Sequence, residues 1–251
     1  DGTTHWLSNP NGVSYDNVTQ AYELESNTIV TSQRLFAGGN NIAVTQYDFS
    51  PIGVTWPTDG GGSPQRHLYL KRLILTNNGA AAKDVDVYWY IDPAINGGDG
   101  YDAMFVDSTK AAMVAYDNTY RVVTGTGTGF SSPNEYNPTT SSGYEKNKSL
   151  YLASAMKVLS NSGSIVSTAT DFWRDTSGDN GQGWIGSRVT LPVGVPVEVD
   201  FIMAGAVDNF AGASGTYNFQ LQNVMQWFYN NSIASLMTQT DSYWQAWLNN
   251  N

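Results

Sequence analysis

The stretch LYLKRLILTNNGAAAKDVDVYWYI, residues 68–91, decides the fold class of this chain. Over residues 85–91, apolar side chains alternate with acidic and tyrosine side chains, which is the two-residue period of a strand with one buried face. The first half is a mostly apolar run, and the Asn-Asn-Gly at 77–79 tolerates positive φ in a tight turn. We therefore expect an antiparallel strand pair joined by this turn, in a protein built mainly from sheet.

Strand-like segments recur at short intervals along the rest of the chain, with Gly, Pro, Asn and Ser between them. Such spacing is typical of a large antiparallel β-sandwich. The segments are residues 28–32, 41–49, 120–123, 149–158, 164–168, 187–192 and 195–203. The last shows the clearest alternation, because Val197, Val199, Phe201 and Met203 share one face.

The end of the chain changes to a helical pattern. Between residues 218 and 248 the apolar positions are spaced by three and four, which indicates amphipathic helix. Two helices are expected, and Thr240 or Asp241 can cap the start of the second. We therefore divide the chain into a β-sandwich at residues 1–216 and a short helical or linker segment at 217–251.

Charge and hydropathy exclude several partners. The 12 basic and 22 acidic residues give a net charge of −10. Without a Lys/Arg cluster to neutralise phosphates, neither nucleic acid nor an anionic membrane surface is an expected partner. The chain lacks an apolar run of about 18 residues, so membrane insertion is not expected either. Its turn-rich, aromatic-rich composition is typical of an extracellular β protein, and we expect a secreted or cell-surface location.

Cysteine is absent, so neither a disulfide nor a thiolate metal site can form. The two histidines, His5 and His67, are far apart and no G-x-S-x-G motif accompanies them, so a serine-type triad and a zinc site are not favoured. The first residue is Asp1 rather than methionine. A mature secreted protein, a processed fragment and a trimmed chain are all compatible with that start.

Two Gly-rich acidic segments, DPAINGGDGYDAMFVD and DTSGDNGQG, are candidate calcium sites. Carboxylate oxygens crowded in a loop suit calcium, although the second segment lacks a following bidentate glutamate. The alternative is a solvated loop organised by Asx-turns. The candidate ligands are Asp92, Asp99, Asp102, Asp107, Asp175 and Asp179.

Aromatic residues in polar loops form a second candidate site. The C–H faces of sugar rings stack on aromatic side chains, and sugar hydroxyls pair with amides and carboxylates. Core packing is the alternative role for the same residues. The candidate carbohydrate contacts are Trp56, Tyr136, Tyr144, Trp173 and Trp184. A carboxylate pair for glycoside hydrolysis is not indicated, because the glutamates are scattered along the chain.

Four segments, LYLKRLILTNNG, VDVYWYIDPAINGGDGYDAMFVD, AYDNTYRVV and EYNPTTSSGYEKNKSLYLASAMKV, together resemble one known domain. They look like the N-terminal β-domain of bacterial and archaeal glucoamylases and glucodextranases of glycoside hydrolase family 15. The terminal SYWQAWLN is similar to the linker helix of those enzymes. The resemblance spans about residues 28–248. It implies an all-β super-sandwich of the galactose-mutarotase-like type, followed by helices and an (α/α)6 barrel.

The resemblance also implies a function. In that family the barrel carries both catalytic glutamates, the acid and the base of an inverting hydrolysis, so no catalytic residue is assigned to this chain. The chain would then be a non-catalytic domain of a glucoamylase-like α-glucan hydrolase, shaping a barrel of the same or a cleaved chain. Tyr243, Trp244 and Trp247 are the expected contacts with that barrel.

Two alternatives remain open. The first is a free-standing carbohydrate-binding or mutarotase-like sandwich whose ligand is an α-glucan or another oligosaccharide. The second is a self-assembling extracellular structural β-protein, joined through its sheet edges and reinforced by bound calcium. Whether this chain is itself an enzyme is not decided by its sequence.

Overall fold

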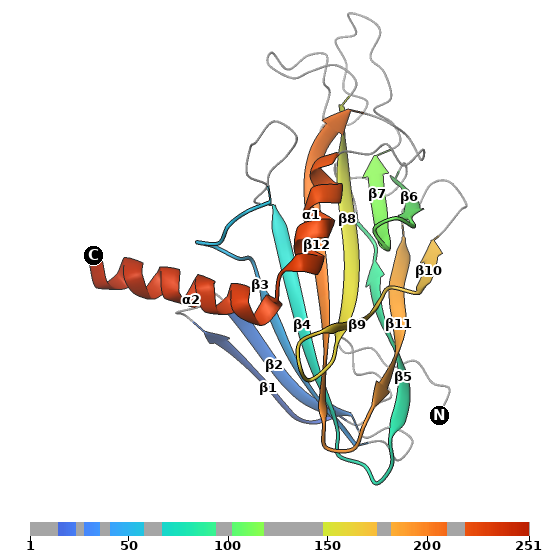
Figure 1. Ribbon diagram of the computed structural model, residues 1–251, viewed down its shortest axis with the longest axis vertical. Helices are drawn as coiled ribbons and strands as arrows, with labels where there is room; N and C mark the ends of the chain where they lie inside the picture. The colour runs from blue at the N-terminus through green and yellow to red at the C-terminus, as the bar shows by residue number, and fades with distance from the viewer. Residues whose placement is uncertain are drawn as a thin grey trace, which may run out of the picture.

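The computed structural model describes residues 15–23, 28–35, 41–57, 67–93, 102–117, 148–174, 182–209 and 219–250. These ranges contain two antiparallel sheets followed by two helices (Figure 1). The all-β sandwich with a short C-terminal helical segment is thereby confirmed. Neither helix in these ranges is long and apolar enough to cross a lipid bilayer.

The larger sheet has the strand order β1-β2-β3-β4-β12-β8-β7-β6, and β9 pairs with β8 off this path. Its strands are β1 (Tyr15–Glu23), β2 (Thr28–Leu35), β3 (Ile42–Phe49), β4 (Leu68–Asn77), β6 (Asp102–Asp107), β7 (Ala112–Asp117), β8 (Lys148–Leu159), β9 (Ile165–Thr168) and β12 (Pro196–Asn209). The smaller sheet has the order β10-β11-β5. Its strands are β10 (Asp171–Arg174), β11 (Gly183–Leu191) and β5 (Lys83–Ile91).

One apolar core lies between the two sheets. Val199 and Phe201 of β12 pack there with Ile185 and Val189 of β11. Trp89 of β5 adds an edge-to-face contact with Phe201, with ring centroids 5.3 Å apart. The alternation over residues 195–203 and 85–91 therefore indicated the buried faces of these strands correctly.

β4 and β5 do not pair with each other, so the hairpin predicted at residues 68–91 is wrong. β4 pairs with β3 and β12, whereas β5 pairs with β11 in the other sheet. Leu73 and Leu75 of β4 pack in the same core as Val85 and Val87 of β5, from opposite sides. Alternation indicates which face of a strand is buried, but it carries no information about the partner strand.

The buried side chain of Asn77 holds this sheet-to-sheet connection in place. Its Nδ2 donates hydrogen bonds to the carbonyls of Ala81 at 2.8 Å and Leu191 at 3.1 Å, and its Oδ1 accepts one from the N–H of Gly79 at 2.9 Å. The N–H of Gly194 donates to the Asn77 carbonyl at 2.8 Å. Leu191 and Gly194 belong to the return from β11 to β12. Asn77 thus links both connections that join the sheets at this end.

The helices α1 (Phe219–Asn230) and α2 (Ile233–Asn250) pack on the face of the larger sheet that points away from the smaller one. Phe228 and Ile233 lie in a second apolar core with Leu70 of β4. Figure 1 shows α1 lying over β12 and β8, while the C-terminal end of α2 projects beyond the sheets. The molecule thus has three layers: the smaller sheet, the larger sheet and the helices.

The second helix begins at Ile233, so the prediction that Thr240 or Asp241 caps its start is wrong. Ser232 precedes the helix, and its carbonyl accepts the first hydrogen bond, from Leu236 at 3.1 Å. Thr240 is instead buried in the middle of α2. The apolar spacing continues through the break between the helices, which is why spacing alone misplaced the boundary.

Residues 52 and 53, after β3, anchor the middle of α2. The N–H of Ile52 donates to Oγ1 of Thr240 at 3.2 Å. Gly53 has φ +67°, and a Cβ at this position would lie 2.6 Å from Cβ of Tyr243. Only glycine combines that backbone conformation with room for the tyrosine. The first half of α2 is therefore fixed to the sandwich.

Candidate functional site

The outer face of the smaller sheet carries a row of aromatic and charged side chains. In the strand register, Tyr88 of β5 lies opposite Gly186 of β11, which lies opposite Asp171 of β10. Alternate residues along each strand share this face, because successive side chains of a strand point to opposite sides. The side chains on this outer face are Asp84, Asp86, Tyr88, Tyr90, Asp171, Trp173, Trp184, Arg188 and Thr190.

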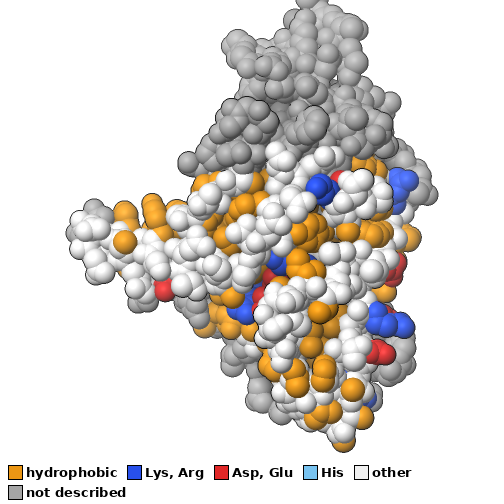
Figure 2. Space-filling view, viewed as in Figure 1, with side chains coloured by type: hydrophobic (Ala, Val, Ile, Leu, Met, Phe, Trp, Pro, Cys, Tyr) orange, Lys and Arg blue, Asp and Glu red, His pale blue; other side chains and the backbone are white. Residues whose placement is uncertain are grey.

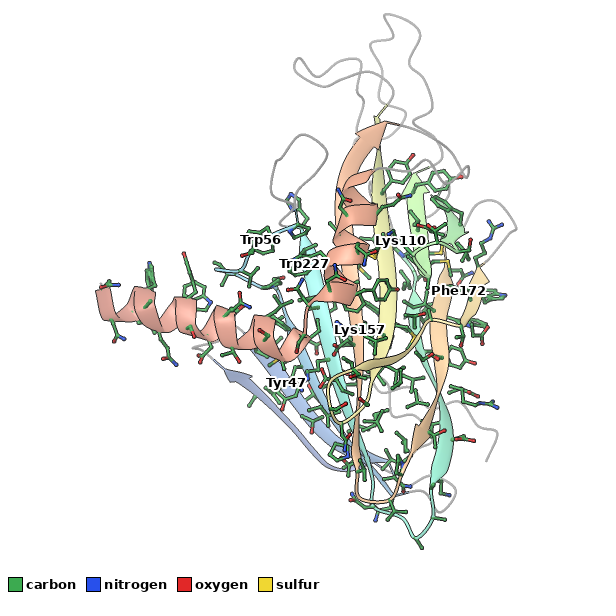
Figure 3. All side chains as sticks on the ribbon, viewed as in Figure 1. Tyr47, Trp56, Lys110, Lys157, Phe172 and Trp227 are labelled. Atoms are coloured by element: carbon green, nitrogen blue, oxygen red, sulfur yellow. The ribbon has the colours of Figure 1, made fainter. Side chains whose placement is uncertain are left out.

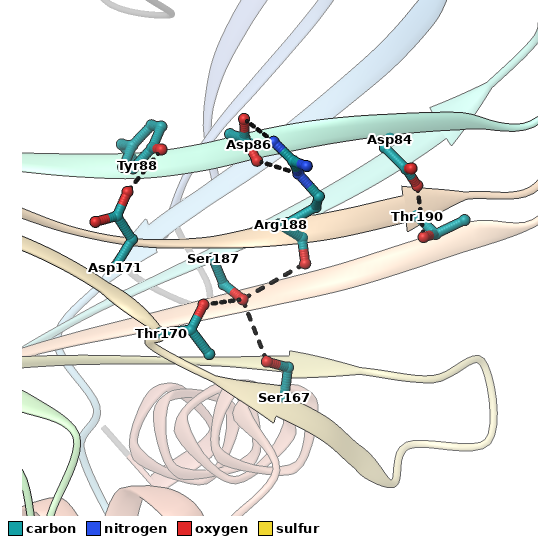
Figure 4. Close-up of polar contacts among 9 residues, drawn as sticks. All are labelled: Asp84, Asp86, Tyr88, Ser167, Thr170, Asp171, Ser187, Arg188 and Thr190. Carbon is teal, nitrogen blue, oxygen red and sulfur yellow. Dashed lines mark hydrogen bonds and ion pairs between the residues drawn. The ribbon is translucent and has the colours of Figure 1, made fainter.

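The ring of Tyr88 lies over Gly186 of β11. A Cβ at Gly186 would be 2.1 Å from Cδ1 and 2.5 Å from Cε1 of Tyr88, so the ring occupies the space above the glycine. The Tyr88 hydroxyl donates a hydrogen bond to Oδ2 of Asp171 at 2.9 Å (Figure 4). Tyr88 is 47% exposed. The ring is therefore covered by the sheet on the side of Gly186, and about half of the side chain is open to solvent.

Two tryptophans stand beside this ring. Trp184 lies nearly perpendicular to Tyr88, with an interplanar angle of 74° and ring centroids 6.0 Å apart. Trp173 stacks on Trp184 from the neighbouring strand, with centroids 4.5 Å apart and an angle of 18°. Tyr88, Trp173 and Trp184 are named the aromatic platform below. Tyr88 forms its floor, and the stacked tryptophans form a wall.

Charged groups border the aromatic platform on the side of β5 and β11. Arg188 donates from Nε and Nη2 to the two carboxylate oxygens of Asp86, at 2.7 and 2.9 Å (Figure 4). This hydrogen bonding lowers the pKa of Asp86, so the pair stays ionised at neutral pH. The hydrogen bond from Tyr88 to Asp171, followed by burial, raises the pKa of the tyrosine, so its hydroxyl stays protonated. The border therefore presents fixed, planar hydrogen-bonding groups.

The structure brings together two of the five residues predicted to contact carbohydrate. Trp173 and Trp184 meet on the platform. Trp56 is elsewhere and packs against the core under the helices, where Trp227 donates from Nε1 to the Thr55 carbonyl at 2.9 Å (Figure 3). Tyr136 and Tyr144 lie outside the described residues.

The calcium candidates that the structure describes do not gather at one point. Asp102 begins and Asp107 ends β6, so at a rise of about 3.3 Å per residue they are roughly 16 Å apart. One ion cannot bind both, because calcium lies within about 2.6 Å of each ligand oxygen. Asp107 accepts hydrogen bonds from N and Oγ1 of Thr109, at 2.9 and 2.6 Å, as in an Asx-turn. Asp92 is exposed after β5. Asp99, Asp175 and Asp179 lie outside the described residues.

No group of three or more His, Asp or Glu residues within the described ranges could hold a metal ion. Calcium binding therefore stays a prediction that concerns the parts of the two acidic segments outside those ranges.

The residues predicted to contact a partner domain lie on the last turns of α2. Tyr243 is 42% exposed and Trp247 50% exposed. Trp244 is partly buried, and its ring lies 5.9 Å from that of Trp247 at an angle of 85°. Leu248 extends the exposed apolar surface. Figure 2 shows apolar side chains along the projecting end of this helix. Contact with a partner stays a prediction.

A buried ion pair under the helices was not predicted. Lys157 of β8 donates from Nζ to the carbonyls of Phe228 at 2.7 Å and Asn231 at 2.5 Å, where α1 ends (Figure 3). Its Nζ is 3.7 Å from Oδ2 of Asp200, and both side chains are fully buried. The signal was present, because Lys157 shares its strand face with Tyr151, Ala153 and Ala155, which line the core.

The environment of Asp200 favours its protonated form. Burial raises the pKa of this carboxyl well above its usual value, and the nearby Glu198 raises it further. Lys157 and Arg72 act in the opposite direction but do not outweigh burial. Arg72 is itself paired with Glu198, at 2.5 Å from Nη2 to Oε2.

This carboxyl should make stability depend on pH. Above about pH 4 the unfolded chain releases the Asp200 proton, whereas the folded chain retains it up to the raised pKa of the buried carboxyl. Between these two pKa values the folded state binds more protons, so stability falls as pH rises. Asp200→Asn removes that contribution. We expect the stability of the variant relative to wild type to increase with pH from about 4 to 7 in urea unfolding.

The matched control is Asp86→Asn, because the Asp86 carboxyl has a lowered pKa. The stability of this variant relative to wild type should show the opposite and smaller dependence on pH. A difference between Asp200→Asn and wild type that does not change with pH would contradict the prediction.

The comparisons with known proteins concern the fold. No protein-family model matches the chain, and no curated protein sequence matches it. A solved structure described as a putative kojibiose phosphorylase from the human microbiome has a similar fold, with a TM-score of 0.58 at 9% sequence identity. The similarity covers 94% of this chain and 25% of that one, so the chain spans about a quarter of its length. The likeness shows the β-sandwich fold of this chain, and it does not select glycoside hydrolase family 15.

Proposed function

We propose that this chain is the non-catalytic β-sandwich domain of an enzyme that acts on α-glucans, and that α2 contacts a helical catalytic domain. The fold supports the proposal, since it matches about a quarter of a putative kojibiose phosphorylase. The observation that carries it is the exposed aromatic end of α2.

α2 changes its surroundings halfway along its length. Ile233, Leu236 and Thr240 are buried against the sandwich. Tyr243 is exposed, and Trp247 and Leu248 lie about one turn further along and are exposed as well, whereas Trp244 is partly buried. A contiguous exposed apolar surface of this kind marks an interaction site. Because the helix projects beyond the sheets (Figure 1), that surface is accessible to a neighbouring domain.

The polar groups under the helices serve the fold rather than catalysis in this proposal. Glu198 is paired with Arg72, and Asp200 lies beside Lys157 with no exposed surface. A general acid or base must reach its substrate directly or through one water molecule. Asp200 does not meet that requirement, and Glu198 is held by Arg72, so we assign the chemistry to another domain.

The enzyme of which this chain would be a domain has two candidate classes. The sequence resembles the β-domain of family 15 hydrolases, which transfer a glucosyl group to water, and we propose that class first. A glycoside phosphorylase is the second candidate, because the similar solved structure is described as one. Phosphate as the acceptor distinguishes the two, since only a phosphorylase requires it.

The proposal predicts further coding sequence beyond residue 251, and the test uses the longer protein that it encodes. We expect that sequence to encode apolar helical repeats, and its product to release glucose from starch or maltose. Trp247→Ala and Leu248→Asp should reduce that activity, because they disrupt the domain contact. In the 251-residue chain the same changes should alter the free energy of unfolding by less than about 0.5 kcal/mol, as at other exposed positions.

Asn249→Ala, on the same exposed turn, is the matched control and should leave the activity unchanged. The 251-residue chain alone should release neither glucose nor glucose 1-phosphate, with or without phosphate. Turnover by this chain in proportion to its concentration would overturn the proposal, and so would a longer protein that is insensitive to both α2 variants.

A further inference from the structure

We infer that the aromatic platform binds a neutral oligosaccharide, with Tyr88 as the stacking floor and Trp184 as the wall. The site is separate from the surface proposed for α2, because the smaller sheet and the helices cover opposite faces of the larger sheet. Only the choice of α-glucans as the first ligands to test rests on the proposed function.

The floor has the shape that sugar stacking requires. A pyranose presents a flat patch of C–H groups, which packs against the face of an aromatic ring rather than its edge. Gly186 leaves room for the ring of Tyr88 over β11, and about half of the Tyr88 side chain remains exposed for a sugar to contact. The hydrogen bond to Asp171 fixes the ring in this position. A fixed ring loses little conformational entropy when a ligand binds.

The wall and the charged border supply the remaining contacts. Trp184, at 74° to Tyr88, can cover the side of a sugar ring stacked on the floor. Trp173 supports it through the stacked contact. At the border, Asp171 and the Asp86–Arg188 pair place planar carboxylate and guanidinium groups beside the floor. Such groups form paired hydrogen bonds, which suit adjacent sugar hydroxyls.

The charge and size of the platform favour this ligand over others. Asp84, Asp86 and Asp171 outnumber Arg188 on this face, and the chain carries a net charge of −10. Nucleic acids and acidic polysaccharides would be repelled. A stable protein interface buries about 800 Å² and 20–30 residues on each partner, far more than three aromatic residues provide. A neutral, hydroxyl-rich chain of pyranose rings is not repelled by the acidic face and is small enough for a platform of three aromatic residues.

The test is calorimetric titration of the 251-residue chain with maltohexaose, isomaltohexaose and cellohexaose, with saturation-transfer NMR to identify the protons in contact. We expect at least one hexaose to bind through its ring C–H protons. Tyr88→Leu should weaken that affinity roughly thirtyfold, as for an aromatic residue at the centre of a binding site. Gly186→Ala should have a comparable effect while retaining every aromatic and charged group, because its Cβ displaces the Tyr88 ring.

Each variant has a matched control in the same chain. Tyr243→Leu removes a tyrosine that is 42% exposed on α2, against 47% for Tyr88. Gly205→Ala adds a methyl group to a strand glycine whose nearest neighbours would be 3.9 Å away. Both controls should bind as wild type does. Thermal unfolding of each protein establishes that it is folded, and Tyr88→Leu, at an exposed position, should retain the wild-type Tm.

Three results would overturn the inference. The first is the absence of binding to all three hexaoses by the wild-type chain. The second is unchanged affinity in both folded platform variants. The third is self-association in sedimentation that Tyr88→Leu abolishes without any sugar binding, which would assign the platform to a second copy of this chain. None of these results bears on the α2 variants, so the proposed function stands or fails separately.

Discussion

Replacing Lys157 with methionine is expected to lower the free energy of unfolding by about 3–5 kcal/mol at neutral pH, the usual effect of removing one partner of a buried ion pair. Methionine keeps a long, flexible stem but cannot donate to the carbonyls of Phe228 and Asn231. It also leaves Asp200 buried without the neighbouring cation. Urea unfolding at pH 7 measures the loss.

The cost of losing Lys157 should be concentrated at the junction of the helices. Its Nζ binds the carbonyls at the end of α1 and lies 4.5 Å from the centroid of the Phe228 ring. In the variant, backbone hydrogen exchange should therefore accelerate more over residues 219–250 than in the strands of the smaller sheet. The loss of stability should also shrink as pH is lowered toward 4, because a protonated Asp200 needs no counter-ion.

The control is the double variant Lys157→Met with Asp200→Leu. Replacing both members of a buried ion pair by apolar groups of similar size is often neutral or stabilising, so most of the lost stability should return. If Lys157→Met costs less than about 1 kcal/mol, or if the double variant is less stable than the single one, the ion pair does not hold the helices on the sheet.

The sequence predicts the local features of this fold, but not the contacts between segments that are far apart in the chain. The alternation over residues 85–91 predicted a strand with one buried face, and β5 has that arrangement. The alternation over residues 195–203 predicted the face of β12 that lies between the sheets, but β12 is also buried on its other face, under the helices. The partners of these strands could not be predicted, because pairing depends on residues about a hundred positions away, as between β5 and β11. Likewise, apolar spacing predicted two helices but not the break at Asn231 and Ser232, since the pattern continues through it.

The same limit applies to the platform. The composition of their segments predicts Trp173 and Trp184 as carbohydrate contacts, and they lie on β10 and β11. The alternation places Tyr88 on the polar face of its strand, but the sequence does not indicate it as a carbohydrate contact. Its role depends on Gly186, which lies opposite it only through the register of β5 and β11. A glycine in a strand signals close approach, but the sequence does not show which residue approaches it.

Replacing Asn77 with alanine is the second change with a large expected effect, a loss of about 3 kcal/mol in the free energy of unfolding. Alanine removes both donors to the carbonyls of Ala81 and Leu191 and the acceptor for the N–H of Gly79. Because Asn77 is fully buried, water cannot replace all three partners. Buried polar groups without partners account for most of the expected cost. Chemical denaturation at pH 7 measures it.

The neighbouring Asn78 provides the matched control. It is exposed, so Asn78→Ala should cost less than about 0.5 kcal/mol. Equal stabilities of the two variants would show that core packing alone fixes the sheet-to-sheet connection. A loss of stability in Asn77→Ala but not in Asn78→Ala would show that the hydrogen bonds of Asn77 are also needed to fix this connection. A hairpin needs only turn residues that suit its backbone, whereas a connection between two sheets leaves strand-end carbonyls facing the interior. The amide of Asn77 binds the carbonyls of Ala81 and of Leu191, the second of which is 114 residues away from Asn77 in the sequence. That requirement explains why a polar residue occupies the buried end of β4.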